Sequence, residues 1–283
     1  MKQFLSCVFC LLSFATLQAQ TTDAVLMTVN GKDVKKSEFE YSYTKNNGAE
    51  AIDKRSEAEY RTLFQDLKLK VAEAETQGLD TTAAFRKEWH DYRSQLIKSY
   101  NVEQEGDSIV KVHIRYGVNA PLARKMEFGK EVPGTDTLFL VEKQAFFVND
   151  FKDYLQQQQI DTAVKGLPMI DALNDYLYQN VVVQLTPQFP ELPYLLQEYR
   201  DGSLSFEITQ QEVWEKAALD TDGLTKFFNK NKSKYSVNGK KPKTYTEVRG
   251  QVITDYQDFL EKEWLQQLRK KYTVTSYQLP VTN

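Results

Sequence analysis

The sequence predicts a mainly helical protein with a few short β-strands, of the α+β class. Long stretches carry apolar residues at helical spacing, and other, shorter stretches alternate like strands. In addition, two separate segments each read as a short strand, a tight turn and a helix. The helical stretches are 56–78, 83–101, 170–185 and 246–271, the alternating ones are 109–116 and 273–279, and the two similar segments are 25–39 and 137–151.

The segments 25–39 and 137–151 align without a gap, which predicts an internal repeat. In both copies a residue that favours helix N-caps, Ser37 or Asn149, precedes an acidic residue that suits the first helical turn. The alternative is a chance similarity between two common motifs. Such repeats are more typical of binding scaffolds than of catalytic ones. The matched apolar pairs are Met27 with Phe139, Val29 with Val141, Val34 with Phe146 and Phe39 with Phe151.

Two amphipathic helices are expected after the first copy. The first ends at Gly78, a residue that suits a helix C-terminus, and Thr81 or Thr82 can cap the second, which runs to Asn101. A strand is expected at 109–116, followed by a loop-like segment at 117–135 with room for one charged helical turn. The first helix has its apolar stripe at Tyr60, Leu63, Phe64, Leu67, Val71 and Ala74.

The C-terminal half predicts further helices, a long last helix at 246–271 and a terminal strand at 273–279. Apolar and polar residues alternate in this terminal strand, which needs the edge of a sheet to pair with, and the strand Val25–Val29 offers such an edge. We therefore expect the two termini to share one core, with the second copy of the repeat as an attached lobe. The shorter elements are helices at 149–159, 170–185, 191–202 (closed by Gly202), 210–220 and 221–232, and a polar turn at 236–243.

The first residues predict a secretory signal peptide that is cleaved after Ala19. A basic start precedes an apolar run that is too short for a membrane anchor. Cys7 and Cys10 both lie within this segment, so the mature chain would contain no cysteine. Thiolate metal sites, thiol nucleophiles and disulfides are thereby excluded. No later stretch reaches membrane-spanning length, so no integral membrane anchor is expected.

Charge and chemistry narrow the function further. The formal net charge is −3, and loss of Lys2 would make it −4, which does not favour nucleic acid as a partner. His90 is interpreted as a surface or rim residue of a helix, and His113 as a strand residue without an obvious partner. The acidic pairs Glu38/Glu40 and Glu261/Glu263 fit solvated helix faces. No catalytic, cofactor-binding or metal-binding residue is predicted.

Aromatic residues are numerous for a helical protein, with 16 Tyr, 16 Phe and 3 Trp. Most belong in the core. The others could line a groove, because aromatic side chains supply contact area at a low cost in rotamer entropy. A groove of this kind would suit extended, unfolded chains.

Several motifs resemble a known family. The segments 29–39, with Val-Asn-Gly-Lys-Asp-Val-Lys-Lys-Ser-Glu-Phe, and 64–80 resemble the opening of the SurA-like and PpiC-type periplasmic foldases. The segments 198–228 and 245–272 are similar to the Bacteroidetes branch of that family and to its long closing helix. The resemblance implies a SurA-like chaperone helical core and a periplasmic location.

The sequence also departs from the pattern of this family. Full members carry parvulin isomerase domains, which would begin near Val112–Ile114, yet the second copy of the repeat starts at Thr137. We therefore expect a signal peptide (1–19), an N-terminal SurA-like domain (20–117), a linker in place of the isomerase domain (118–135) and a C-terminal part (136–283). Its last helix and strand, 245–281, would pack back on the N-terminal domain.

These expectations lead to a non-catalytic periplasmic chaperone for unfolded outer-membrane or secreted proteins, with a related foldase as another potential partner. The binding face would come from the two repeats and the helices 56–77 and 83–100. Two alternatives stay open. One is a divergent peptidyl-prolyl isomerase, and the other is a non-catalytic subunit of an envelope complex.

Overall fold

The computed structural model describes residues 23–236 and 243–277. Helices account for 64% of the structure and the sheets are small and antiparallel, which confirms the predicted mainly helical α+β class. The predicted signal peptide at 1–19, with its cleavage site after Ala19, lies outside the described residues. The same holds for most of the polar turn predicted at 236–243 and for the end of the predicted terminal strand.

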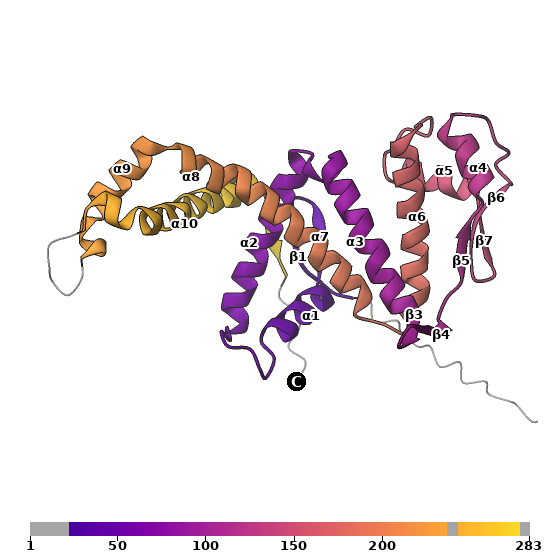
Figure 1. The fold of residues 1–283 in the computed structure, drawn as a ribbon, viewed down its shortest axis with the longest axis horizontal. Helices are drawn as coiled ribbons and strands as arrows, with labels where there is room; N and C mark the ends of the chain where they lie inside the picture. Colours follow the sequence, from indigo (N-terminus) through magenta and orange to yellow (C-terminus); the bar gives the residue numbers. More distant parts are fainter. Residues whose placement is uncertain (1–22, 237–242, 278–283) are drawn as a thin grey trace, which may run out of the picture.

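Each copy of the predicted repeat folds as a β-hairpin that leads directly into a helix (Figure 1). Residue pairing in the two hairpins corresponds position by position, including a β-bulge near the start of the first strand. The bulge lets two neighbouring residues face the core in each copy, Leu26 with Met27 and Leu138 with Phe139. The elements are β1 (Val25–Val29), β2 (Lys32–Lys35) and α1 (Lys36–Asn46) in the first copy, and β6 (Thr137–Val141), β7 (Gln144–Phe147) and α5 (Val148–Gln157) in the second.

The predicted N-caps are wrong by two positions. The helices begin at Lys36 and Val148, so Ser37 and Asn149 lie inside the first turn. The reason is the second strand of each hairpin, which runs into the helix without a loop. In α5 the backbone N–H of Phe147 is instead satisfied by the carboxylate of Asp150, at 2.7 Å.

A third strand completes each hairpin to a three-stranded sheet. β5 (Tyr116–Val118) pairs with β6, and β8 (Val274–Ser276) pairs with β1. The two registers again correspond, since Val274 lies opposite Val29 and Tyr116 opposite Val141. The two ends of the described chain therefore meet in one sheet, as the sequence predicts.

The helices after each hairpin are exchanged between the two halves of the chain. These helices are α2 (Glu57–Thr76) and α3 (Ala83–Asn101) in the first half, and α6 (Leu167–Leu185) and α7 (Leu192–Thr209) in the second. α2 packs against α7, and α3 packs against α6 (Figure 1). Each half also supplies the third strand of the other half's sheet, so the two repeats are intertwined.

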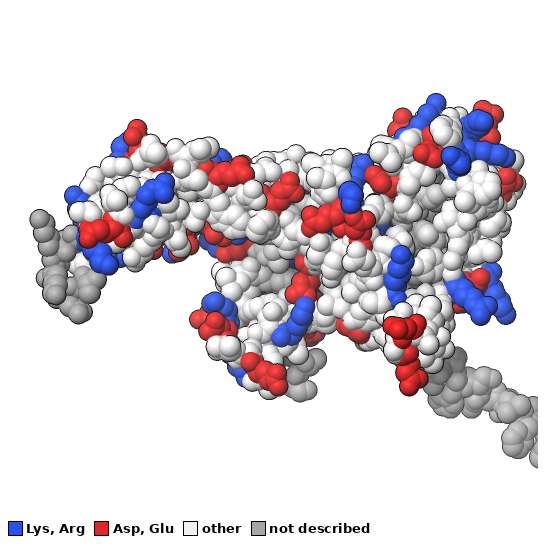
Figure 2. Space-filling view, in the orientation of Figure 1, with Lys and Arg blue, Asp and Glu red and all other residues white. Residues whose placement is uncertain are grey.

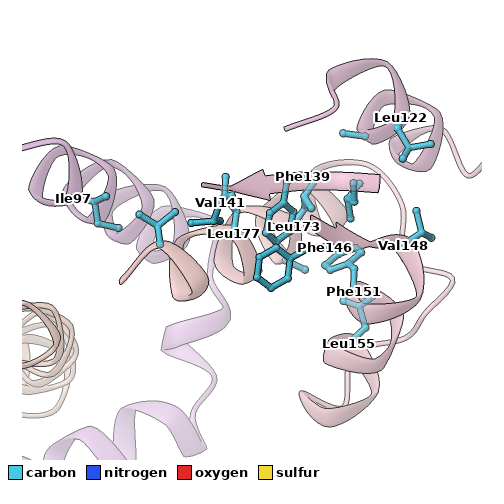
Figure 3. Close-up of a cluster of buried hydrophobic side chains, with 14 of the residues drawn as sticks. Ile97, Leu122, Phe139, Val141, Phe146, Val148, Phe151, Leu155, Leu173 and Leu177 are labelled. Atoms are coloured by element: carbon cyan, nitrogen blue, oxygen red, sulfur yellow. The ribbon is translucent and has the colours of Figure 1, made fainter. Parts of the chain in front are cut away.

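The exchange is visible in the two main clusters of buried side chains. We call the parts around β2–β1–β8 and β7–β6–β5 the first and second lobes. Ile97 of α3 belongs to the core of the second lobe, which Figure 3 shows around Phe139 and Phe151. Leu204 and Ile208 of α7 belong to the core of the first lobe. Neither lobe therefore has a complete core without a helix from the other half.

The segment predicted as a linker, 118–135, belongs to the second lobe. It contains the end of β5 and the helix α4 (Ala120–Glu127), and Leu122 and Ala123 are buried in the core of that lobe. The strand predicted at 109–116 is also wrong in extent. It is divided into β4 (Ser108–Val112), which forms an exposed hairpin with β3 (Val102–Glu105), and β5. Between them the buried side chain of Asn101 bonds both backbone groups of Ile114, which ends the alternating stretch.

The helix predicted to end at Gly202 continues much further. α7 runs into a π-helical turn, η2 (Gln210–Trp214), and then into α8 (Glu215–Leu219). The prediction failed because apolar burial on both sides of the glycine, as at Leu204, favours the continuous helix over a break.

The remaining helices form an arm at the opposite end of the molecule from the second lobe (Figure 1). α9 (Thr221–Lys230) packs on the predicted long helix, α10 (Tyr245–Lys271), around the buried residues Leu224, Phe228 and Val252. The other end of α10 packs on α2 before β8 joins the first sheet. Short 3₁₀ turns are η1 (Leu79–Thr81) and η3 (Lys232–Tyr235).

Candidate functional site

An open groove lies between the start of α3 and the face of α7 that continues over η2. Its volume is about 700 Å³, within the range of ligand-binding clefts. The helices that form it belong to different halves of the chain and lie side by side near the middle of the molecule (Figure 1). Its lining is Ala84, Phe85, Glu88, Glu198, Tyr199, Gly202, Ser203, Phe206, Glu207, Gln210, Gln211 and Glu215.

The π-helical turn sets which residues face this groove. From Leu204 onward, the fully buried apolar residues of α7, η2 and α8 are Leu204, Ile208, Val213 and Ala217, with successive spacings of 4, 5 and 4 residues. A regular α-helix would rotate the last two out of the core. The extra residue of the π turn keeps them inside.

The opposite face of the same helix keeps the same spacing and is exposed. It carries Phe206, Gln210, Glu215 and Leu219, and the exposed fractions of Phe206 and Leu219 are 60% and 82%. Phe206 packs edge-on against Trp214, with ring centroids 5.1 Å apart. The groove therefore has an aromatic side chain that is held in place and largely open to solvent.

Gly202 lies on the floor of the groove in the middle of α7. A Cβ atom at this position would have no other described atom within 4 Å, apart from the helix's own backbone and chain neighbours. Packing therefore does not demand a glycine here. Its effect is to leave open space between α3 and α7 that any longer side chain would occupy.

The charged residues that line the groove are all acidic. Four of its lining residues are glutamates, Glu88, Glu198, Glu207 and Glu215, and none of its lining residues is a lysine or arginine. Figure 2 shows acidic side chains gathered over the middle of the molecule, where α3 and α7 lie. Glu198 is paired with Lys45 at 2.6 Å.

The two helices are joined beside the groove by aromatic stacking and a hydrogen bond. The rings of Tyr92 and Tyr199 lie parallel with centroids 3.4 Å apart. The Tyr199 hydroxyl donates to Glu88 at 2.9 Å. Burial, with the hydrogen bond to Glu88, raises the pKa of Tyr199, so this hydroxyl remains a donor at neutral pH. These contacts hold the two helices of the groove against each other.

His90, predicted as a surface or rim residue, lies at the rim of a cleft and is mostly buried. Its side chain is 15% exposed and lies between α3 and α6, where Nε2 is 3.7 Å from Asp171 and Nδ1 is 3.3 Å from Arg93 Nη2. Arg93 binds Asp175 at 2.6 Å in the same contact. The helical pattern does not show the partners of His90, because the partner helix comes from the other half of the chain. A second cleft, of about 730 Å³, opens beside His90, but its lining mixes lysine and arginine with aspartates.

His113 has partners that the sequence did not reveal. Its side chain is 5% exposed, with Nδ1 3.1 Å from Gln188 and Nε2 3.6 Å from Glu103. Its ring packs edge-on against Phe189. Both histidines thus connect elements of the fold. Within the described part of the chain, no group of three or more His, Cys, Asp or Glu residues is arranged to hold a metal ion.

The acidic pairs have mixed outcomes. Glu40 and Glu263 are exposed, as predicted, and Glu261 pairs with Lys70. Glu38 instead points inward and binds Lys68, which also binds the buried Asp201 of α7. Burial alone would lower the pKa of Lys68, but attraction to Asp201 and Glu38 outweighs it and raises the pKa. The sequence did contain an indication that Lys68 is buried, because Lys68 follows Phe64 by four residues and so lies on the apolar face of its helix.

Of the elements expected to form a binding face, α3 lines the groove. α2 is packed between α7 and α10 and contributes no lining residue, and neither do the two repeat segments, 25–39 and 137–151. The sequence missed α7 and η2, whose exposed Phe206 is indistinguishable in the sequence from a core aromatic residue. Among the described helices, none is long and apolar enough to cross a membrane. No protein-family model, curated protein or solved structure matched this chain.

Proposed function

We propose that this protein is an exported chaperone that binds unfolded secreted or outer-membrane proteins and does not catalyse their isomerisation. The observation that carries the proposal is the open groove, in which a largely exposed aromatic residue, Phe206, lies on helices that are fixed to each other. An open, rigid groove with exposed aromatic surface suits extended chains of varied sequence.

The fold supports the non-catalytic form of this proposal. The resemblance to SurA-like foldases would place an isomerase domain after Ile114. In this chain, β5 and α4 take that place, and both pack into the second lobe. Both histidines are used in contacts between elements. The proposal therefore assigns no catalytic residue.

An aggregation assay tests the proposal. An unfolded outer-membrane barrel protein is diluted from denaturant, and light scattering is followed with and without the mature protein. We expect the scattering to be delayed at equimolar protein, because exposed apolar segments of the client are covered. Unchanged scattering at a large molar excess would contradict the proposal.

Two further measurements separate the alternatives. Acceleration of prolyl isomerisation in a short peptide would favour a divergent isomerase. A single stoichiometric partner recovered from envelope extracts would favour a subunit of a complex, whereas many unfolded clients, with or without a related foldase, favour the chaperone.

A further inference from the structure

We infer that the groove between α3 and α7 binds extended client segments in which lysine or arginine residues flank aromatic or aliphatic ones. The inference rests on the proposed function and adds a specificity to it. Three features of the groove lead to this class of ligand: its charge, its exposed aromatic residue and the open space above Gly202.

The charge selects cationic segments. Among the described residues, no lysine or arginine forms an ion pair with Glu88, Glu207 or Glu215, and their contacts are to neutral groups. Glu88 accepts from Tyr199, Glu207 accepts from Gln211 at 3.5 Å, and Glu215 accepts from Gln210 at 3.0 Å. Neighbouring carboxylates without a cation create a negative potential that attracts lysine and arginine and repels acidic segments.

The aromatic residue selects the apolar part of the segment. Phe206 is exposed over 60% of its surface and lies between Glu207 and Gly202 in the lining. An apolar side chain of the client can cover this ring while a neighbouring lysine or arginine reaches a carboxylate. A cationic side chain can also stack on the ring itself.

The open space determines the size of the ligand. The groove volume of about 700 Å³ accommodates several side chains of an extended segment. Gly202 contributes by having no side chain at the floor. A Cβ atom added here meets open space, so a bulky side chain at this position would extend into the groove.

Peptide binding by the intact mature protein tests the inference. The probes are two fluorescent peptides with the same aromatic and aliphatic core, one flanked by lysines and the other by glutamates, and the readout is fluorescence anisotropy. We expect the lysine peptide to bind at least about tenfold more tightly, with a preference that shrinks at high salt. Equal affinity for the two peptides would overturn the inference.

Position 202 provides a matched pair of variants. Gly202→Ala should leave binding of the lysine peptide unchanged, since a methyl group occupies little of the groove. Gly202→Trp should weaken it by about tenfold or more. Wild-type affinity in Gly202→Trp would overturn the inference. If that variant does not fold, Phe206→Ser serves instead, because removal of an exposed side chain leaves the core intact, and an unchanged affinity again rejects the groove.

The outcome is separable from that of the proposed function. If Gly202→Trp loses peptide binding but still delays aggregation as the wild type does, the specificity assigned to the groove stands and clients are held elsewhere. If the wild type shows the peptide preference but never delays aggregation, the groove is correct and the chaperone function is wrong.

Discussion

At the residue scale, the buried cation Lys68 connects both halves of the chain. Lys68 of α2 lies between Glu38 of α1 and Asp201 of α7, with exposed side-chain fractions of 8%, 20% and 2%. A buried charge is costly to remove from water, so each of these groups depends on the others for compensation. The contact fixes α7 against the first repeat and so holds one wall of the groove.

We therefore expect Lys68→Met to destabilise the protein by about 3–5 kcal/mol, because it removes the close cation from Glu38 and leaves the buried Asp201 with only Arg200, at 3.8 Å. Urea unfolding measured by circular dichroism gives the change in the free energy of unfolding. The matched control is Lys36→Met, which removes an exposed pair with Glu40 and should cost less than about 1 kcal/mol. Equal effects of the two substitutions would show that Lys68 is not buried as described.

At the element scale, the π-helical turn acts as a one-residue insertion in a long helix. It explains why the fully buried apolar residues Ile208 and Val213 are five residues apart, while the neighbouring spacings, from Leu204 to Ile208 and from Val213 to Ala217, are four. Deletion of one residue within the turn would restore a regular α-helix with Val213 and Ala217 still inside. Deletion elsewhere in α7 would rotate part of the helix out of its core.

Deletion of Gln210 should therefore be tolerated, with a loss of about 1 kcal/mol or less, because its side chain is exposed and bonds only Glu215 among the described residues. Deletion of Ser205 is the control and should cost several kcal/mol, since it turns the buried residues on one side away from the core. Thermal unfolding of the two variants decides between them. Equal destabilisation of the two variants would contradict the conclusion that the π-helical turn contains the one extra residue of the helix.

The sequence specified individual elements well and their partners poorly. The hairpins were detectable because the turn, the strand pattern and Phe39 or Phe151 lie close together in the sequence. The exchange of α3 and α7 between the two halves was not detectable. An amphipathic stripe such as Tyr60–Val71 shows which face of a helix is buried, but it does not show which other element packs on that face. The groove depends on this exchange, and so Phe206 and Glu207 could not be assigned to a site from the sequence.

At the scale of the whole molecule, the chain closes on itself through its last helix and strand. The end of α10 is held on α2 by Glu73, which accepts hydrogen bonds from Lys271 at 2.6 Å and from Tyr272 at 2.8 Å. β8 then completes the first sheet. Loss of this contact would release the terminal strand and open the first lobe.

This closure should weaken in acid. Burial would raise the pKa of Glu73, but hydrogen bonds from Gln77, Lys271 and Tyr272 outweigh it and hold the pKa below 4.5. The contribution of Glu73 to stability is therefore fully present above pH 4.5 and is lost as the pH falls through the lowered pKa. Glu73→Gln should be less stable than the wild type at neutral pH, and the difference should shrink on acidification. A difference that stays constant with pH would contradict this assignment.

We propose that this intertwined, non-catalytic scaffold holds unfolded chains in the groove beside Phe206, and site-specific photo-crosslinking is the decisive measurement. A photoreactive residue is placed at position 206 and, as a control, at Val183, which is also 60% exposed but lies on α6 outside the groove lining. With an unfolded outer-membrane protein, we predict strong crosslinking from position 206 and little from position 183. No crosslinking from position 206, or equal yields from the two positions, would contradict the account.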